Sequence, residues 1–307
     1  MSQVLRIATR KSALAMWQAR HVQSLLEQSW PELVVELVPV VTQGDRILDR
    51  PLALIGGKGL FLKELERALL RGEADLAVHS MKDVPVQMTD GLSLDVVLPR
   101  ATPFDALVCR EGGSLAELPA GSRLGTSSLR RQCQLLAARP DLLVSDLRGN
   151  VDTRLAKLDA GQYDAIILAC AGLERLGLGG RISEQLEPPH WIPASTQGII
   201  ALQTCSGDAA VAERIRPLND ADTAIAARAE RMVVQRLEGS CQLPLAVYAR
   251  LEDRLHIQAM VGMPDGSSVI RAQRSGSPLE PEMLAKQVTE QLLQQGAGEI
   301  ISSLEIK

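Results

Sequence analysis

The sequence predicts an α/β protein in which mostly parallel sheets are followed by a small C-terminal α+β domain. Over the first two thirds of its 307 residues, short β-branched runs alternate with helical patterns. Such alternation is typical of parallel sheets covered by helices. Toward the C-terminus the strand patterns follow one another across short turns, which is typical of an antiparallel sheet. A chain of this length can form two or three domains, each with its own core.

The first predicted unit ends at the proline-containing segment 99–103. Residues 4–8 have the pattern of a strand. Ser12 is placed to cap the helix that follows, because its hydroxyl can accept from the free N–H groups of the first turn. The remaining predicted elements are strands at 33–41, 75–79 and 92–98 and a helix at 60–70.

The second unit repeats this alternation and ends at a proline-rich run around residues 188–193. Its predicted elements are strands at 106–109, 142–147 and 164–169 and helices at 128–138 and 151–159. A helix at 222–237 leads into the third unit, with strands expected at 245–250, 255–261 and 268–274. A turn at Pro264-Asp265-Gly266 joins the last two strands, and a final helix begins at Pro281 and is closed by Gly296.

Composition and charge exclude several classes of protein. The net charge of −4, the pI near 5.7 and the seven aromatic residues argue against a nucleic-acid surface. No stretch approaches the roughly 20 uncharged apolar residues of a membrane span, and no apolar signal core precedes the first strand pattern. We therefore expect a cytoplasmic protein with no nucleic-acid or membrane partner.

The cysteines and histidines argue against disulfide, metal and hydrolase chemistry. The five cysteines are odd in number and widely spaced, without a CxxC pair. The four histidines lack metal-ligand spacing, and no nucleophile elbow accompanies a serine. No metal is expected.

The basic residues are strongly biased toward arginine, with 26 Arg against 7 Lys. Arginine binds carboxylates and phosphates through two parallel hydrogen bonds, so the bias indicates a small ligand with several negative charges. A GC-rich coding sequence would produce the same bias without any ligand.

The segment Thr126-Ser127-Ser128-Leu129-Arg130-Arg131 lies where a strand gives way to a helix. Hydroxyls and free amides converge at such a helix start, which is the geometry of an anion site. Arginines in the first helical turn lie at the positive end of the helix dipole, so Arg130 and Arg131 need a compensating anion. The alternative is a capped helix with arginines that face solvent.

A second corner repeats this arrangement, with Arg148 at the end of a strand, a Gly149-Asn150 turn, and Arg154 in the helix that follows. Ligands of open α/β sheets bind beyond the carboxyl ends of the strands, so both corners are expected to face one crevice. Arg10 holds the equivalent place in the first unit, although an ordinary surface arginine would also explain it.

Asp83 is the catalytic candidate. The run 79–85 follows a strand, and Pro85 keeps Val84 extended, which places Asp83 at the same sheet edge as the arginines. A carboxylate repels anions, but it can stabilise a developing cation or move a proton. The alternative is that Asp83 pairs with Lys82 or caps a turn.

Two loops carry further candidates. The glycine-rich stretches 42–45 and 55–59 are typical of a mobile lid, in which Lys58 could reach an anion, and they lack the Walker pattern. Cys241 lies on a Gly- and Pro-bounded loop, where a thiol can be exposed and reactive, whereas the other cysteines fall in strand or helix patterns typical of buried positions.

Several long motifs together resemble the porphobilinogen deaminase family. The matching segments keep the family order over nearly the whole chain and are Gly59-Leu60-Phe61, Lys63-Glu64-Leu65-Glu66, 79–85, 125–135, 147–158, 163–178 and 237–244. The resemblance implies two α/β lobes like those of type II periplasmic binding proteins plus a small C-terminal α+β domain. The implied boundaries are 1–98 with 199–217, 104–192 and 220–307, with crossovers near 99–104 and 193–199.

The resemblance also implies the chemistry, which is condensation of four porphobilinogen molecules, with loss of ammonia, into hydroxymethylbilane. The cofactor is a dipyrromethane in thioether linkage to the cysteine matching Cys241, and the catalytic aspartate matches Asp83. Cofactor-contacting positions match Ser80, Lys82, Thr126, Ser127, Ser128, Arg130, Arg131, Arg148 and Arg154. Substrate-binding positions match Arg10, Lys58, Arg175 and Gln197, and the family is usually monomeric.

One segment departs from the family pattern. Where the family usually reads Pro-Ala-Val-Gly-Gln-Gly-Ala-Leu-Gly-Ile-Glu, residues 193–203 read PASTQGIIALQ, which keeps Gln197 and Gly198 but ends in Gln203. We expect the loss of two glycines to stiffen this crossover. Two alternatives stay open, namely a non-catalytic two-lobe protein that binds a small polycarboxylate and a paralogue that has lost turnover. Asp83 and Cys241 discriminate, because a carboxylate-binding protein needs neither.

Overall fold

The computed structural model describes residues 3–41, 62–237 and 243–305. The chain forms two compact units, one made of Met1–Ala101 and Gly198–Ala224 and the other of Thr102–Gln197 and Ile225–Lys307. Within the described residues no helix is both long and apolar enough to cross a membrane.

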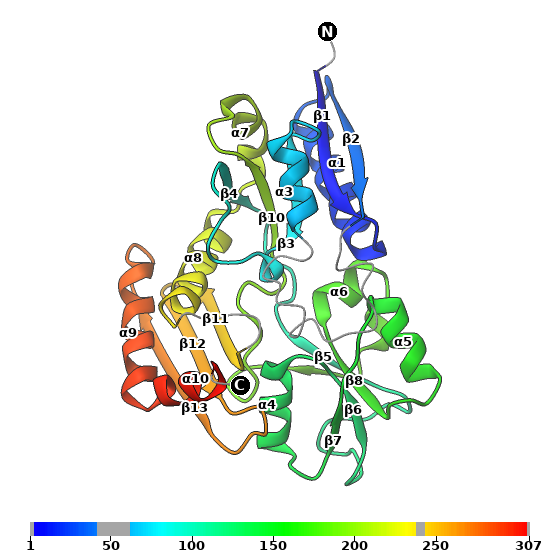
Figure 1. Ribbon diagram of the computed structural model, residues 1–307, viewed down its shortest axis with the longest axis vertical. Coiled ribbons are helices and arrows are strands. Elements are labelled where there is room, and N and C mark those ends of the chain that lie inside the picture. The colour runs from blue at the N-terminus through cyan, green and yellow to red at the C-terminus, as the bar shows by residue number, and fades with distance from the viewer. Residues whose placement is uncertain (1–2, 42–61, 238–242, 306–307) are drawn as a thin grey trace. The chain divides into compact units, whose positions relative to one another are not determined.

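The first unit contains a five-stranded sheet in the order β2-β1-β3-β10-β4 (Figure 1). Its strands are β1 Gln3–Arg10, β2 Leu33–Val40, β3 Leu76–Ser80, β4 Leu92–Val97 and β10 Ile200–Cys205. β1 pairs in parallel with β2 and β3, whereas β10 lies between β3 and β4 and runs antiparallel to both. The expectation of a mostly parallel sheet is therefore confirmed, because β1, β2, β3 and β4 run in one direction and only β10, a strand from much later in the chain, runs in the opposite direction.

Helices cover both faces of this sheet, as the alternation of side chains along a strand requires. They are α1 Ala13–Ser29, α3 Lys63–Leu70, α7 Ala209–Ile215 and the 3-10 turns η2 Met81–Asp83 and η4 Arg216–Leu218. Leu5 and Ile7 of β1 share a core with α1, whereas Ala8 of the same strand shares a core with α3. The predicted cap is confirmed, since the Ser12 side chain accepts from the backbone N–H of Ala15.

The second unit begins with a five-stranded sheet in the order β7-β6-β8-β5-β9. Its strands are β5 Asp105–Cys109, β6 Arg123–Gly125, β7 Leu143–Ser145, β8 Ala165–Ala169 and β9 Glu184–Leu186. Its helices are α4 Leu129–Ala138, α5 Val151–Asp159, α6 Cys170–Arg175 and the turn η3 Gly179–Arg181. β6 is parallel to β7 and β8, whereas β5 is antiparallel to β8 and β9, so this sheet is also mixed.

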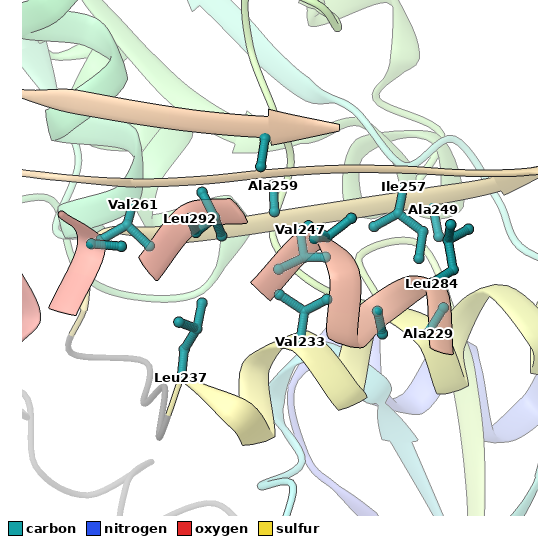
Figure 2. Close-up of a cluster of buried hydrophobic side chains, with 14 of the residues drawn as sticks. Ala229, Val233, Leu237, Val247, Ala249, Ile257, Ala259, Val261, Leu284 and Leu292 are labelled. Carbon is teal, nitrogen blue, oxygen red and sulfur yellow. The ribbon is translucent and has the colours of Figure 1, made fainter. Parts of the chain in front are cut away.

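The C-terminal part of the second unit is an antiparallel sheet, β11-β12-β13, as the sequence predicts. The strands are β11 Leu245–Leu251, β12 Leu255–Gly262 and β13 Val269–Gly276, and the helices are α8 Ala221–Arg236, α9 Pro281–Gln294 and α10 Ala297–Glu305. Figure 2 shows side chains of α8 and α9 facing those of β11 and β12, for example Val233 toward Val247.

The expectation that Gly296 closes the final helix is wrong, because α10 follows it directly. Gly296 has φ +97, which ends α9, but the chain resumes a helical turn at the next residue. Ala297, Ile300, Ile301 and Leu304 recur at helical spacing and pack on the domain core. This short apolar pattern in the sequence indicates the last helix, which the sequence analysis did not predict.

Candidate functional site

The first candidate site is the carboxyl end of β3 in the first unit. The strand ends at Ser80, and the next three residues form the turn η2, which carries Lys82 and Asp83. Val84 is extended, with φ −90 and ψ 121, as expected before Pro85. The helical pattern therefore stops here, and Asp83 is left exposed at the sheet edge.

A small cavity of about 90 Å³ opens at this edge. Arg10, at the end of β1, lines it together with Ser80 and Asp83. Parallel neighbours β1 and β3 bring these ends to one edge. A guanidinium, a hydroxyl and a carboxylate thus share one cavity, which can bind a ligand carboxylate and also face a developing cation.

Two polar residues of this cavity, Gln18 and His79, were not predicted as site residues. Gln18 is buried on α1 and donates its Nε2 to the Ser80 Oγ at 2.8 Å. The available signal was a glutamine on the buried stripe of an amphipathic helix, one turn before Val22.

His79 is also buried, and its Nε2 lies 2.8 Å from the Oε1 of Gln203 on β10. Burial lowers the pKa of His79, while the bond to Gln203 opposes that shift. No pattern in the sequence pairs these two residues, because they are brought together only by the insertion of β10 beside β3.

A second candidate site is the edge of the second unit at which β6, β7 and β8 end. These three parallel strands are followed by the segment 126–131, by Arg148 with Arg154, and by α6 with Arg175. Their carboxyl ends lie at one sheet edge, so the predicted convergence of the two arginine corners is consistent with the topology.

The hydroxyls of the first corner all have backbone partners. The Ser128 side chain caps α4 by accepting from the N–H of Arg131. The Thr126 Oγ1 accepts from the N–H of Ser128 at 3.2 Å. The Ser127 Oγ donates to the carbonyl of Leu147 and accepts from its N–H, both at 3.1 Å. The corner is thereby tied to the end of the neighbouring strand.

Arg130 and Arg131 are buried, and the anion that compensates them is a side chain of the protein itself. Asp105, at the start of β5, lies 2.7 Å from Arg130 Nη1 and 2.6 Å from Arg131 Nη2. Burial raises the pKa of Asp105, but the attraction and hydrogen bonds of the two guanidiniums outweigh it and hold that pKa well below its ordinary value. The interpretation of these arginines as solvent-facing is therefore wrong.

Asp105 collects two further donors, which extend this buried network to the crossover. Trp191 donates its Nε1 to Asp105 Oδ2 at 2.7 Å, and Gln197 donates its Nε2 to Oδ1 at 3.0 Å. The same Nε2 also donates to the carbonyl of Pro103 at 2.7 Å. Sequence reasoning missed Asp105, whose signal was a charged residue opening a fully apolar strand.

The second corner keeps its arginines near the turn between β7 and α5. Asn150 caps α5 by accepting from the N–H of Thr153, and Gly149 has φ +112, a conformation that favours glycine. The Arg154 Nε donates to the carbonyl of Gly149 at 2.8 Å, and Arg148 is half-buried. This cap and glycine turn set where the arginines lie.

Arg175 ends α6 and is half-buried. Burial lowers its pKa to about 10, with Glu174 opposing that shift. A guanidinium at this sheet edge can form charge-assisted hydrogen bonds with a carboxylate.

Lys58 and Cys241, and the loops 42–61 and 238–242, lie outside the described residues. The expectation that the other cysteines are buried is confirmed for Cys109, Cys133 and Cys170, whereas Cys205 is half-buried. Among the described residues, no group of three or more His, Cys, Asp or Glu side chains is arranged to hold a metal ion.

The fold defines a two-lobed α/β protein with a small C-terminal domain, and each lobe carries candidate site residues at the carboxyl ends of its parallel strands. Residues 5–213 match the family model "Porphobilinogen deaminase, dipyromethane cofactor binding domain". Residues 224–294 match the model "Porphobilinogen deaminase, C-terminal domain". The chain therefore belongs to the porphobilinogen deaminase family, whose members are transferases of tetrapyrrole synthesis that use a dipyrromethane cofactor to form hydroxymethylbilane.

Solved structures of other proteins match this chain at low identity. The periplasmic VFT2 domain of Bordetella pertussis BvgS is 20% identical, with 76% of this chain and 92% of that chain covered and a TM-score of 0.42. The periplasmic aliphatic sulphonate binding protein SsuA from Escherichia coli is 18% identical, with 78% and 71% covered and a TM-score of 0.38.

Proposed function

We propose that this chain is a cytoplasmic, monomeric hydroxymethylbilane synthase in which Asp83 is the catalytic carboxylate. The enzyme would condense four porphobilinogen molecules, releasing one ammonia for each. The observation that carries the proposal is the cavity at the end of β3, because Asp83, Arg10 and Ser80 line it together. A site for binding a carboxylate alone would not need an aspartate in that place.

Asp83 supplies negative charge where the reaction develops positive charge. As ammonia leaves, the substrate pyrrole becomes cationic, and a carboxylate within the cavity stabilises it and accepts from pyrrole N–H groups. Arg10 and the Ser80 hydroxyl would bind an acetate or propionate of the same pyrrole. Lys82, on the same turn, would contact the cofactor.

The residues of the second unit fit a ligand with several carboxylates. The dipyrromethane supplies the pyrrole on which the chain grows, and its acidic side chains match the cationic groups at the ends of β7 and β8. Arg148, Arg154 and Arg175 would bind these carboxylates, and the corner Thr126-Ser127-Ser128 would donate to them.

The cofactor-binding role of Arg130 and Arg131 and the substrate-binding role of Gln197 remain proposals based on the family match. Their contacts with Asp105 support an indirect contribution, in which they fix the start of α4 and the crossover. Lys58, in the glycine-rich loop, would reach a substrate carboxylate. The boundaries 1–98 with 199–217, 104–192 and 220–307 remain predictions.

Attachment of the cofactor to Cys241 is tested by the intact mass of the denatured protein beside Cys241→Ser. We expect a wild-type adduct of two porphobilinogen units, each less ammonia, and no adduct on the variant. An unmodified wild type that also fails to load with added porphobilinogen would favour the binding-protein or inactive-paralogue alternative.

Turnover is tested separately with Asp83→Asn, which keeps the shape of the side chain and removes its charge. We expect loading to persist or slow while release of ammonia falls by about 100-fold or more, in line with the loss of an electrostatic catalytic group. Gln87→Glu, at an exposed residue four positions after Asp83 in the chain, serves as a control for a change of charge near the turn. A near-normal rate in Asp83→Asn would refute the catalytic role.

A further inference from the structure

A chain of hydrogen bonds runs through the first unit to the cavity of Asp83. The Thr89 Oγ1 donates to Glu66 Oε2 at 2.9 Å. Gln203 donates its Nε2 to Glu66 Oε1 at 3.1 Å, and its Oε1 lies 2.8 Å from His79 Nε2. Gln203 is fully buried, and His79 is 8% exposed and lines the cavity. The far end of the chain therefore reaches the cavity that Asp83 also lines.

The direction of each bond follows from the chemistry of Glu66. An ionised carboxylate can only accept, so the Gln203 group that faces Glu66 must be its amide nitrogen. The Gln203 oxygen then faces His79 and can only accept, so the His79 Nε2 must carry the proton. The other ring nitrogen, Nδ1, needs no proton to satisfy this chain.

Charges around His79 oppose one another. Glu66 on α3 and Asp83 on η2 favour the imidazolium, but burial outweighs both and lowers the pKa of His79 below its ordinary value. The neighbouring elements also carry charged side chains, namely Arg6 and Arg10 on β1, Arg20 and Glu27 on α1, Lys63, Glu64 and Arg67 on α3, and Lys82 on η2. Of these, Arg10 lines the same cavity as His79, where a second positive charge would be unfavourable. Gln203 adds an acceptor without adding a charge.

A carboxylate at position 203 would change this balance. It would lie against the Glu66 carboxylate and the His79 ring, and two neighbouring carboxylates around one imidazole would favour a shared or transferred proton. Position 203 is also the last residue of the segment in which this chain departs from the family pattern.

We propose that Gln203 fixes the tautomer of the buried His79 ring, with the proton on Nε2, and that His79 is a positioning residue that adds no positive charge to the cavity that Asp83 also lines. An imidazolium there would pair with the Asp83 carboxylate and would repel a cation forming on the substrate. With a neutral ring, the Asp83 carboxylate can stabilise that cation without an opposing charge from His79. This inference rests on the proposed role of Asp83.

The charge state of His79 is measured by ¹⁵N NMR of the imidazole nitrogens in the full-length protein between pH 5.5 and 8. With only four histidines in the chain, His79→Gln identifies the His79 signals. We expect wild-type His79 to stay neutral and protonated at Nε2 over this range. We expect Gln203→Glu to carry an imidazolium at pH 6, and the exposed Gln28→Glu to leave His79 unchanged.

The link to Asp83 is measured by the pH profile of kcat/KM for porphobilinogen. Between pH 8 and pH 6, kcat/KM of Gln203→Glu should fall by about tenfold more than kcat/KM of the wild type. This difference corresponds to a change of about one unit in the pKa that controls kcat/KM. A histidine that is already charged in the wild type, or one that stays neutral in Gln203→Glu, would overturn the assignment of the charge. A charged His79 with an unchanged pH profile would overturn the link to Asp83.

A third variant covers the case in which Gln203→Glu does not fold. Gln203→Met removes the acceptor without adding charge, so His79 should stay neutral but lose its preference for the Nε2 proton. An unchanged preference would contradict the proposal. If the wild type forms no product, the proposed function fails, whereas the NMR result still decides the state of His79.

Discussion

Replacing Asp105 by asparagine removes one negative charge from a site where four side chains donate to it. Arg130, Arg131, Trp191 and Gln197 all donate to this carboxylate. The Asp105 side chain is fully buried, and the two guanidiniums are 6% and 8% exposed. Asparagine would leave two buried cations without a counter-charge and would turn an amide N–H toward other donors.

The expected cost follows from this burial. Breaking a buried ion pair by removing one partner costs about 3–5 kcal/mol of unfolding free energy. A matched control exists in the same unit, because Asp159 and Arg181 also pair at 2.6 Å but are 54% and 36% exposed. Asp159→Asn should lower the free energy of unfolding by only about 0–1 kcal/mol, since water already solvates both groups of an exposed ion pair. The two pairs differ mainly in burial.

Urea unfolding followed by tryptophan fluorescence measures both variants. Trp191 is itself a donor to Asp105, so a background with Trp17→Phe and Trp30→Phe makes the signal specific to the second unit. Equal losses of unfolding free energy for Asp105→Asn and Asp159→Asn would refute the argument.

The pH dependence has a definite sign. The folded pKa of Asp105 is depressed, so its stabilisation is fully present above the unfolded value of about 3.9 and is lost as the pH falls through the folded value. The difference between wild type and Asp105→Asn should therefore be constant from pH 5 to 8 and should shrink only in strong acid. A difference that grows or falls between pH 5 and 8 would point to another group.

Two further predictions concern packing and thiols. Gly266 has φ +74, and a Cβ added there would meet the backbone of Ala137, so Gly266→Ala should lower the free energy of unfolding by about 2 kcal/mol or more. Gly121 has φ +80 but open space around it, so Gly121→Ala should lower the free energy of unfolding by only about 1 kcal/mol. Equal shifts in Tm would contradict this. Burial raises the pKa of Cys133 to about 11 and of Cys170 to about 12, so iodoacetamide at pH 8 should leave both unmodified until urea unfolds the chain. Peptide mass mapping checks this, and modification of either thiol in the native protein would contradict it.

Much of the local structure could be predicted from the sequence, because helix caps and side-chain periodicity act over a few residues. The cap at Ser12 and the helix Val151–Asp159 were predicted correctly for this reason. The arginine corners were also visible as motifs, since each directly follows a strand in the chain. The family motifs added the identity of the chemistry, which periodicity alone does not contain.

The tertiary structure decided which residues meet. β10 enters the first sheet between β3 and β4, and only this pairing places Gln203 beside His79. Asp105 likewise receives donors from segments 25 to 92 residues away in the chain. Side-chain period reveals which face of a strand is buried, but the choice of neighbouring strand depends on free energy gained across the whole core. The sequence by itself therefore determined the elements and the kind of chemistry, whereas long-range pairing determined the buried polar contacts around it.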